Sequence, residues 1–415
     1  MSEAKGLIVI LSVLLHTAHA ADAPAMSSSG DARALHEKML VLDTHLDTPA
    51  NFSQPGWSIL DRHSDAGEDS QVDLPRMLEG GLDGGFWVIY TGQGPRTPEG
   101  LQNARDAALL TAMRIREMVA SHPQHFDLAL HSSDAARIAQ QGKRVVYMSI
   151  ENGYPLGKDP TLLKTFHRLG VRMFGPVHFR NNDLGDSATD PTREWHGLSP
   201  LGKELIAHAN RLGILLDASH SSDDVLDQML ELSKTPIILS HSGCKAIFDH
   251  PRNVDDTRLR KLAANGGVIQ MNNLGAYLRH IPQDPQRDAA LAELRKQYGP
   301  TNTLSPIEAQ AFREARRAID KRYPVERATF EDFMKHLLHA LQLVGPDHVG
   351  IGADWDGGGG SEGLDDIAAL PKITQRLLDE GYSPTDIEKI WSGNLLRILA
   401  AAERYATSYA QQNPL

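Results

Sequence analysis

Eight short apolar runs alternate with longer stretches of helical periodicity along most of this 415-residue chain. Short apolar runs that are bounded by turns and separated by helices are typical of the buried strands of a parallel sheet. Eight such strands predict an α/β fold that closes into a (β/α)8 TIM barrel, with an open, doubly wound sheet as the alternative. The predicted strands span residues 39–43, 85–90, 144–150, 171–174, 214–217, 236–240, 267–271 and 348–352.

A histidine or an acidic residue stands at the end of five of these runs. The carboxyl ends of barrel strands open on one face, so residues far apart in the sequence converge there. In an open sheet the same strand ends would lie in a line and could not surround one point, which favours the barrel. The residues concerned are His45, Asp47, Glu151, His220, His241 and Asp354.

Three histidines and several carboxylates, in a chain with a single cysteine, form a ligand set that suits zinc or a similar divalent cation. His45 and Asp47 are two residues apart, so on a strand both side chains point the same way and can reach one cation. A carboxylate buried at Glu151 is costly unless it is paired or binds a cation, which makes it a candidate bridge between two metal ions. Because two ions about 3.5–4 Å apart can activate a water, the pattern predicts a two-metal hydrolase.

Further polar residues are expected near the same face. His178 follows the fourth run and can polarise a carbonyl oxygen. Arg252 follows the sixth run and its loop, and it fits either a bidentate clamp on a substrate carboxylate or a surface salt bridge. Asp354 can pass a proton or bind a substrate ammonium, and Asp217 can orient a ligand imidazole.

Helical periodicity and capping signals place helices between the strands. Ser199 followed by Pro200 is a strong start signal, because Ser is favoured as an N-cap and Pro at the first helical position. The predicted helices span residues 31–38, 100–121, 160–169, 199–211, 222–233 and 254–265, with two more, 288–298 and 306–320, inside an insert.

The first twenty residues are predicted to be a secretory signal peptide that is not part of the fold. Residues 6–15 form an apolar core that is too short to span a bilayer. Ala18 and Ala20 then provide a small-x-small cleavage site. We therefore expect a secreted or periplasmic protein, with a flexible lead-in at residues 21–30.

The remaining chain is predicted to be one barrel domain, residues 31–407, with a C-terminal tail at residues 408–415. Two long inserts interrupt the rhythm of strands and helices, near residues 51–71 and 280–324. The first follows the first predicted strand and is expected to cover the barrel mouth. The second follows the seventh predicted strand and is expected to form a flap or an oligomer contact.

The net charge of −11 and the lack of any basic run argue against nucleic acid and against an anionic membrane surface as partners. Cys244 is the only cysteine, so no intrachain disulfide can form. The polar C-terminus offers no tail anchor, and we expect no membrane anchor once the signal peptide is removed.

Seven motifs in this order resemble those of the membrane dipeptidase (renal dipeptidase) family of zinc peptidases, which belongs to the amidohydrolase-type barrels. The resemblance extends from about Val41 to Leu399. The motifs are DTHLDTP (43–49), IENG (150–153), GLSPLG (197–202), RLGILLDASH (211–220), PIILSHS (236–242), PRNV (251–254) and GADWDG (352–357).

The resemblance implies a metallo-dipeptidase with two zinc ions per chain. One zinc would be bound by His45 and Asp47, the other by His220 and His241, and Glu151 would bridge them. A hydroxide between the metals would attack the peptide carbonyl.

The resemblance also implies how a substrate is held. His178 would bind the scissile carbonyl or its oxyanion, Arg252 the substrate carboxylate, and Asp354 the free amino group. The substrates implied are dipeptides, often with a D-residue at the C-terminal position. A homodimer is suggested by the resemblance alone.

Two alternatives remain open at this stage. One is another amidohydrolase-type metal hydrolase that opens a β-lactam, a lactone or an ester. Many such enzymes bridge their metals with a carboxylated lysine after the fourth strand, and residues 171–180 contain no lysine. The other is a barrel that binds peptides or amino acids without catalysis. Thr44 and Leu46, which flank the first histidine, depart from the family pattern. So do residues 271–277 after the seventh predicted strand and the 51–71 insert, regions that shape the substrate pocket, so the preferred side chains are not predicted.

Overall fold

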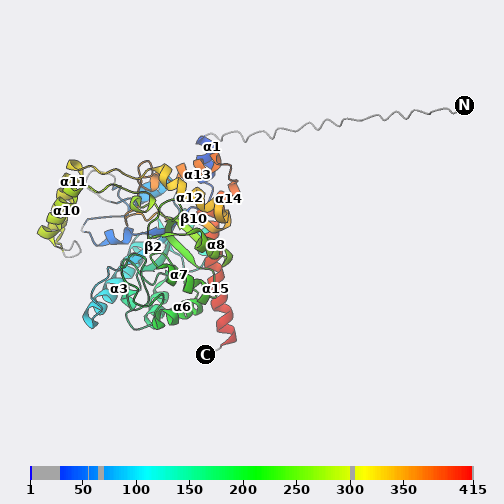
Figure 1. Ribbon diagram of the computed structural model, residues 1–415, viewed down its shortest axis with the longest axis horizontal. Coiled ribbons are helices and arrows are strands. Elements are labelled where there is room, and N and C mark those ends of the chain that lie inside the picture. The colour runs from blue at the N-terminus through cyan, green and yellow to red at the C-terminus, as the bar shows by residue number, and fades with distance from the viewer. Residues whose placement is uncertain (2–28, 55, 64–69, 300–303, 414–415) are drawn as a thin grey trace.

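The computed structural model describes residues 1, 29–54, 56–63, 70–299 and 304–413 (Figure 1). Most of the predicted signal peptide and lead-in, residues 1–30, lies outside the described residues. None of the described helices is long and apolar enough to cross a membrane.

Eight parallel strands form the ring of the barrel, and each contains or overlaps one of the predicted runs. Two further strands, β3 (Phe126–Leu128) and β8 (Asn253–Val254), extend it beside β4 and β7 and were not predicted. The ring strands are β1 (Leu42–Leu46), β2 (Gly84–Tyr90), β4 (Arg144–Glu151), β5 (Val171–Phe174), β6 (Leu215–Leu216), β7 (Ile238–Cys244), β9 (Val268–Met271) and β10 (Val349–Ile351).

The ring consists of two hydrogen-bonded groups of strands, β1-β2-β4-β5-β6 and β7-β9-β10. Within a group, neighbours pair over several residues, and β2 pairs with β4 along its whole length. Between the groups, each seam has one isolated parallel bridge in the described part of the chain. Asp217 bridges to Ile238 at the β6–β7 seam, and Leu46 bridges to Trp355 at the β10–β1 seam. The sheet therefore closes, but its backbone ladder is weakest at these two places.

Helices connect and cover the strands. They are α1 (Ser29–His36), α2 (Leu74–Gly80), α3 (Pro98–Ser121), α4 (Asp134–Gln140), α5 (Leu162–Leu169), α6 (Pro200–Leu212), α7 (Asp223–Leu232), α8 (Asp256–Ala264), α9 (Gly275–Leu278), α10 (Pro285–Tyr298), α11 (Pro306–Arg322), α12 (Phe330–Val344), α13 (Pro371–Asp379), α14 (Pro384–Glu388) and α15 (Asn394–Gln412). The predicted cap of α6 is present, because the Ser199 hydroxyl accepts a hydrogen bond from the Gly202 N–H at 3.0 Å.

One cluster of buried apolar side chains fills the inside of the ring. It takes at least one residue from seven ring strands, among them Leu42, Phe86, Tyr147 and Ile238, together with Leu399 of α15. Side chains from so many strands of one ring meet only on its inner side. A larger cluster packs the outer faces of the strands against the helices.

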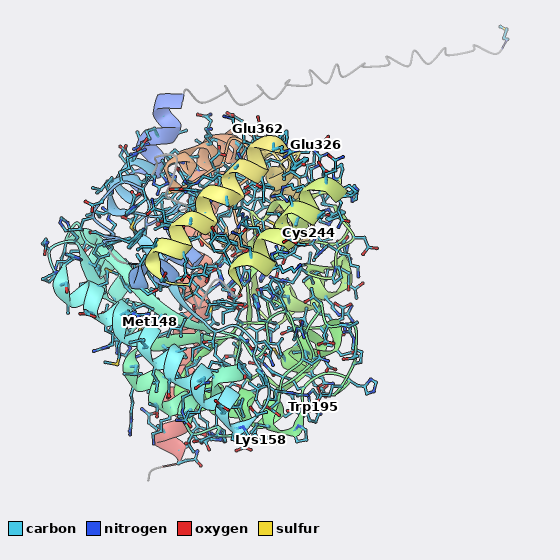
Figure 2. All side chains as sticks on the ribbon, turned by 90° about the vertical axis from the view of Figure 1, so that its left-hand side faces the viewer. Met148, Lys158, Trp195, Cys244, Glu326 and Glu362 are labelled. Atoms are coloured by element: carbon cyan, nitrogen blue, oxygen red, sulfur yellow. The ribbon has the colours of Figure 1, made fainter. Side chains whose placement is uncertain are left out.

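The insert near residues 280–324 contains the helices α10 and α11. They form a hairpin that stands away from the ring, at the left of Figure 1. Figure 2 views the molecule from that side and shows the two helices side by side in front of the body. The ring of Tyr298 meets that of Phe312 between them, with centroids 5.7 Å apart.

Candidate metal centre

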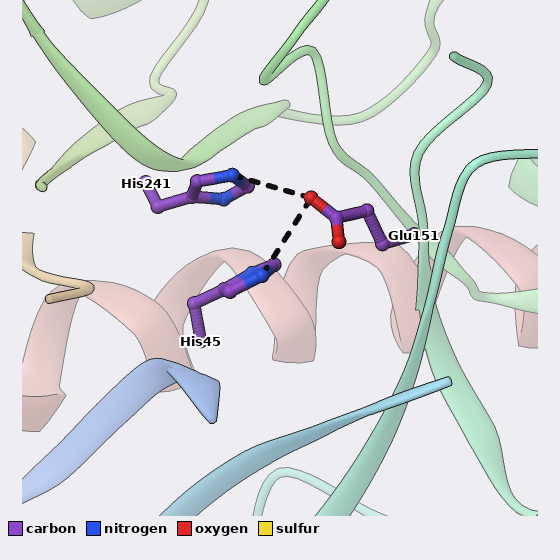
Figure 3. Close-up of side chains that lie close together, drawn as sticks. All are labelled: His45, Glu151 and His241. Atoms are coloured by element: carbon purple, nitrogen blue, oxygen red, sulfur yellow. Dashed lines mark ion pairs between the residues drawn. The ribbon is translucent and has the colours of Figure 1, made fainter. Parts of the chain in front are cut away.

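The residues predicted from the strand ends meet at one place, around the side chain of Glu151. Its Oε1 lies 3.1 Å from Nε2 of His220, 3.3 Å from Nε2 of His241 and 3.6 Å from Nε2 of His45. Figure 3 shows the His45 and His241 rings pointing at this oxygen from two sides. Glu151 ends β4, while the three imidazoles come from β1, the turn after β6, and β7.

The other candidates extend this cluster. Asp47 Oδ2 lies 3.3 Å from His45 Nε2, and His178 Nε2 lies 3.7 Å from Glu151 Oε1. Potential ligand atoms of His45, Asp47 and Asp354 lie within 4.8 Å of one another, as do those of two other groups that both contain Glu151. The structure thus gathers all the residues predicted for the metal site.

The donor atoms of the cluster fit divalent cations. Neither ring nitrogen of His45 makes a well-aligned hydrogen bond to a described residue, and the Nδ1 of His220 makes none either. Both side chains are buried, and buried polar atoms normally have a partner. Imidazole nitrogens and carboxylates in this combination are ligands that zinc prefers. A cation would supply the missing partner of the His45 Nε2.

Electrostatics at the cluster favour a positive charge beside the carboxylates. Burial by itself lowers the pKa of His45, but Glu151 and Asp47 outweigh it and raise that pKa well above its usual range. Burial would raise the pKa of Glu151, yet the imidazoles of His178 and His45 hold it well below its usual range. The carboxylates therefore favour a proton on the His45 ring. A bound metal ion would take the place of that proton.

The imidazoles at β6 and β7 are neutral, as metal ligands must be. Burial lowers the pKa of His220 and of His241 well below the usual value, and the positive charge of Arg252 lowers both further. Burial also lowers the pKa of His178 to about 4. For Asp354, burial raises the pKa to about 7, aided by the charges of Asp47 and Glu151.

Left-handed turns direct several of these side chains into the site. Among the described residues, four of the five non-glycine residues with positive φ lie there: Asn152 at 69° and His220, Asp354 and Asp356 at 64°. This conformation is unfavourable for residues with a Cβ and is held in place by the surrounding fold. All four residues lie in the segments that follow β4, β6 and β10 at the barrel mouth.

Arg252 is buried, so the surface salt-bridge interpretation is wrong. Its guanidinium donates a hydrogen bond to the His241 carbonyl at 3.0 Å and lies 5.3 Å from the centre of the Tyr277 ring. Only 3% of the residue is exposed. Its Nε has no hydrogen-bond partner among the described residues, which leaves a donor for a substrate anion.

A cavity of about 310 Å³ opens over the metal-site residues. It is lined by Asp47, Glu151, His178, His220 and Asp354 among the polar residues, and by Tyr90, Phe179, Leu274 and Tyr277 among the apolar ones. The four apolar residues were missed from the sequence. Tyr90 ends a predicted strand and Phe179 follows His178, so their positions carried a signal. Leu274 and Tyr277 lie in the stretch after the seventh predicted strand that departs from the family pattern.

Asp356 also lines this cavity and connects the loops around it through hydrogen bonds. Its carboxylate accepts hydrogen bonds from the Thr48 hydroxyl at 2.7 Å and the Gln71 N–H at 2.5 Å. It thereby joins the two ends of the first insert to the loop after β10.

A parallel β/α barrel with histidines and carboxylates gathered at the carboxyl ends of its strands defines a metal-dependent hydrolase of the amidohydrolase type. Within that class the chain belongs to the membrane dipeptidase family, peptidase family M19, whose model matches residues 30–413. The family shows that the protein is a metallo-dipeptidase enzyme, as the sequence motifs predicted.

Individual relatives agree with this assignment. The chain is 30% identical to Dipeptidase tcpJ of Claviceps purpurea over 346 residues, which cover 81% of this chain and 70% of the relative. It is similar in structure to the probable dipeptidase PvdM of Pseudomonas aeruginosa, with a TM-score of 0.77 and 30% identity over 91% of this chain and 99% of the other. A second solved structure, dipeptidase AC, a metallopeptidase of the M19 family, has a TM-score of 0.69 and 26% identity, covering 88% of this chain and 98% of that one.

Proposed function

We propose that this dipeptidase is a binuclear zinc enzyme that cleaves dipeptides with free amino and carboxyl ends and tolerates a D-residue at the C-terminal position. The observation that carries the two-metal proposal is the position of Glu151. Its Oε1 lies between the imidazole of β1 and those that follow β6 and lie on β7, within 3.1–3.6 Å of each Nε2. One carboxylate in contact with both sets of ligands is what a bridge requires.

His45 and Asp47 would hold one cation, and His220 and His241 the other, with Glu151 shared between them. When bound, the two cations would lower the pKa of a water and offset negative charge on the carbonyl oxygen. The protein contributes a dry, shaped site for these ions, because all five ligands are largely buried.

The remaining polar residues fit the ends of a zwitterionic dipeptide. The buried Arg252 supplies positive charge, and its Nε–H, which has no hydrogen-bond partner among the described residues, can donate to the carboxylate. Asp354 supplies a carboxyl group for the amino end and can exchange a proton with the departing amine. His178, held neutral by burial, can donate its N–H to the carbonyl oxygen as charge develops there. The cavity of about 310 Å³ lies at the small end of the range for ligand pockets, ~300–1,000 Å³, which suits a two-residue peptide.

The direct test is hydrolysis of L-Ala-D-Ala and of L-Ala-L-Ala, with the metal content measured on the same sample. We expect cleavage with about two zinc ions per chain, lost on chelation and restored by zinc. If the protein holds two zinc ions but cleaves no dipeptide, we would infer that its substrate is a lactone or another ester. Neither metal nor turnover would contradict the proposal and favour a non-catalytic binding barrel.

Glu151→Gln tests the bridge. The amide keeps the shape of the side chain but removes its charge, so we expect zinc content to fall below that of the native protein and turnover to drop to background. Glu380→Gln, on the surface beside Arg376, is the matched control. Full activity in Glu151→Gln would rule out the bridging role.

A further inference from the structure

The seam between β6 and β7 is held by side chains where the backbone ladder is short. Asp217, the residue after β6, accepts hydrogen bonds at Oδ1 from the backbone N–H groups of Ser219 and Ser240, both at 2.9 Å. Its Oδ2 accepts a hydrogen bond from the Ser240 hydroxyl at 2.6 Å. Asp217 is 4% exposed and Ser240 is fully buried, so water does not compete for these contacts. One carboxylate thus joins the two groups of strands.

The hydroxyl of Ser240 also contacts the imidazole of His241. Its Oγ lies 2.8 Å from His241 Nδ1. A hydroxyl has one proton, and here it is donated to Asp217 at 2.6 Å, because a carboxylate can only accept. The Ser240 oxygen must then accept from His241, which places the ring proton on Nδ1. The lone pair of His241 is left on Nε2.

That lone pair faces the metal site. His241 Nε2 lies 3.3 Å from Glu151 Oε1 and 2.8 Å from Nε2 of His220. Two nitrogens this close and aimed at one point suit a shared cation. The backbone of His241 is fixed from the same side, since its N–H donates to the Ser219 hydroxyl at 3.1 Å. Ser219 precedes His220, so the seam contacts set the position of both ligands relative to each other.

Among the three imidazoles around Glu151, His241 is the one whose Nδ1 is held by a hydrogen bond at this seam. The Nδ1 atoms of His45 and His220 have no hydrogen-bond partner among the described residues. An imidazole with a fixed tautomer loses less freedom on binding a metal ion, and such hydrogen-bonded partners typically matter by 10–100-fold in affinity.

We propose that Asp217 and Ser240 form a relay that fixes the tautomer and orientation of His241 as a metal ligand. Both are positioning residues that act through His241 and touch neither metal nor substrate. The inference rests on the proposed zinc site for its role in affinity, but the tautomer itself is a property of the metal-free protein. The two can therefore be tested separately.

Asp217→Asn is the decisive variant because it reverses the relay. The amide oxygen can still accept both backbone N–H groups, while the amide nitrogen now donates to the Ser240 oxygen. The Ser240 proton must then go to His241 Nδ1, which moves the ring proton to Nε2, toward the metal site. We expect zinc affinity, measured by competition with a chelator, to fall roughly 10–100-fold.

The tautomer is read directly from nitrogen chemical shifts of ¹⁵N-histidine-labelled, metal-free protein, with the His241 signal identified by its loss in His241→Gln. We expect the proton on Nδ1 in the native protein and on Nε2 in Asp217→Asn. Ser240→Ala removes the acceptor while keeping Asp217, so it should lose the preference for Nδ1 and weaken zinc binding. Ser392→Ala, which removes a buried hydroxyl in the π-helical turn Lys389–Gly393, outside the seam contacts, is the control.

Each outcome decides the proposal. The relay would be overturned if Asp217→Asn kept the native tautomer of His241 and bound zinc with an affinity within twofold of the control. If Asp217→Asn does not fold, Ser240→Ala decides in the same way. If the native protein binds no zinc, the proposed function fails, and the nitrogen spectra of the metal-free proteins still support or overturn the relay.

Discussion

At the scale of single residues, the site depends on one position that has no side chain. A Cβ at Gly357 would lie 2.0 Å from Asp47 Oδ2 and 2.3 Å from Asp354 Oδ1. Both distances are far inside van der Waals contact. The glycine therefore lets the loop after β10 approach the carboxylates of the metal site.

We expect Gly357→Ala to weaken zinc binding and catalysis while leaving the fold intact. The added methyl group must push Asp47 or Asp354 away from its present position, and a displacement of about 1 Å at a catalytic group can cost roughly 100-fold in rate. Zinc content and kcat/KM check this. Gly92→Ala, where the nearest atom to the new Cβ is 3.8 Å away, is the control. A native kcat/KM in Gly357→Ala would show that the loop after β10 moves and that the carboxylates of Asp47 and Asp354 stay in place.

Asp354→Asn tests proton transfer to the departing amine. The side chain is buried, and the Asn272 amide lies 3.3 Å from its Oδ2, so the substituted amide keeps a place in the site. We expect kcat to fall roughly 10²–10⁴-fold, the usual contribution of a general acid or base. Steady-state kinetics with L-Ala-D-Ala measure it. An undiminished kcat would remove Asp354 from the chemistry.

At the scale of elements, a buried polar chain joins three helices to the body. His36 at the end of α1 contacts Thr374 of α13 through Nδ1 at 2.7 Å and the Gly80 carbonyl of α2 through Nε2 at 2.9 Å. The Trp391 indole donates to the Thr374 hydroxyl at 2.8 Å. The Gly80 carbonyl can only accept, so the ring carries a proton on Nε2, and when the ring is neutral the Thr374 hydroxyl donates to Nδ1.

The buried imidazole of His36 makes the stability of the protein depend on pH. Burial lowers the pKa of His36 from 6.5 to about 4. Below pH 6.5 the unfolded chain gains a proton at this ring that the folded protein does not take up, so stability falls as the pH drops toward 4. The contribution lost between pH 7 and pH 4.5 is about 2–3 kcal/mol.

His36→Gln should reduce that loss, because glutamine can donate to Gly80 and accept from Thr374 without titrating. Urea unfolding at pH 7 and pH 4.5 measures the difference in free energy for each protein. His280→Gln, at an exposed position, is the control. An equal loss in His36→Gln and the native protein would contradict the assignment.

The elements were largely predictable from the sequence, and their limits were less so. All eight ring strands lie at predicted runs because buried parallel strands must be apolar on both faces. The fifth run shortens to β6, Leu215–Leu216, and Asp217 after it keeps only an isolated bridge to Ile238 in place of a continuous ladder. The short strands β3 and β8 have no such apolar signal.

At the scale of the whole molecule, the metal ligands connect both groups of strands. His45 and Glu151 belong to the group that contains β1 and β4, while His241 lies on β7. A cation held between them would join the two groups near the seams, where the ladder is weakest.

We therefore expect metal removal to destabilise the entire barrel. A ligand that binds only the folded state adds about 2.7 kcal/mol per site at a concentration 100 times its Kd. Thermal unfolding of chelated and zinc-loaded protein measures the shift, which should be absent in Glu151→Gln. Equal melting temperatures with and without zinc would show that the ions do not bind or do not stabilise the folded barrel.

The sequence by itself determined the barrel, the strand ends that carry the site, and the identity of the candidate ligands. Periodicity and turn chemistry are local, and the convergence of strand ends follows from the topology of any parallel barrel. The sequence offered Asp217 as a residue that orients a ligand imidazole. Only the tertiary structure decided that Arg252 is buried beside His241, that Tyr277 and Phe179 line the cavity, and that the Ser240 hydroxyl stands between Asp217 and His241. These depend on contacts across the seams and between loops, where distances of a few tenths of an ångström separate a hydrogen bond from none, and no pattern along the chain encodes them.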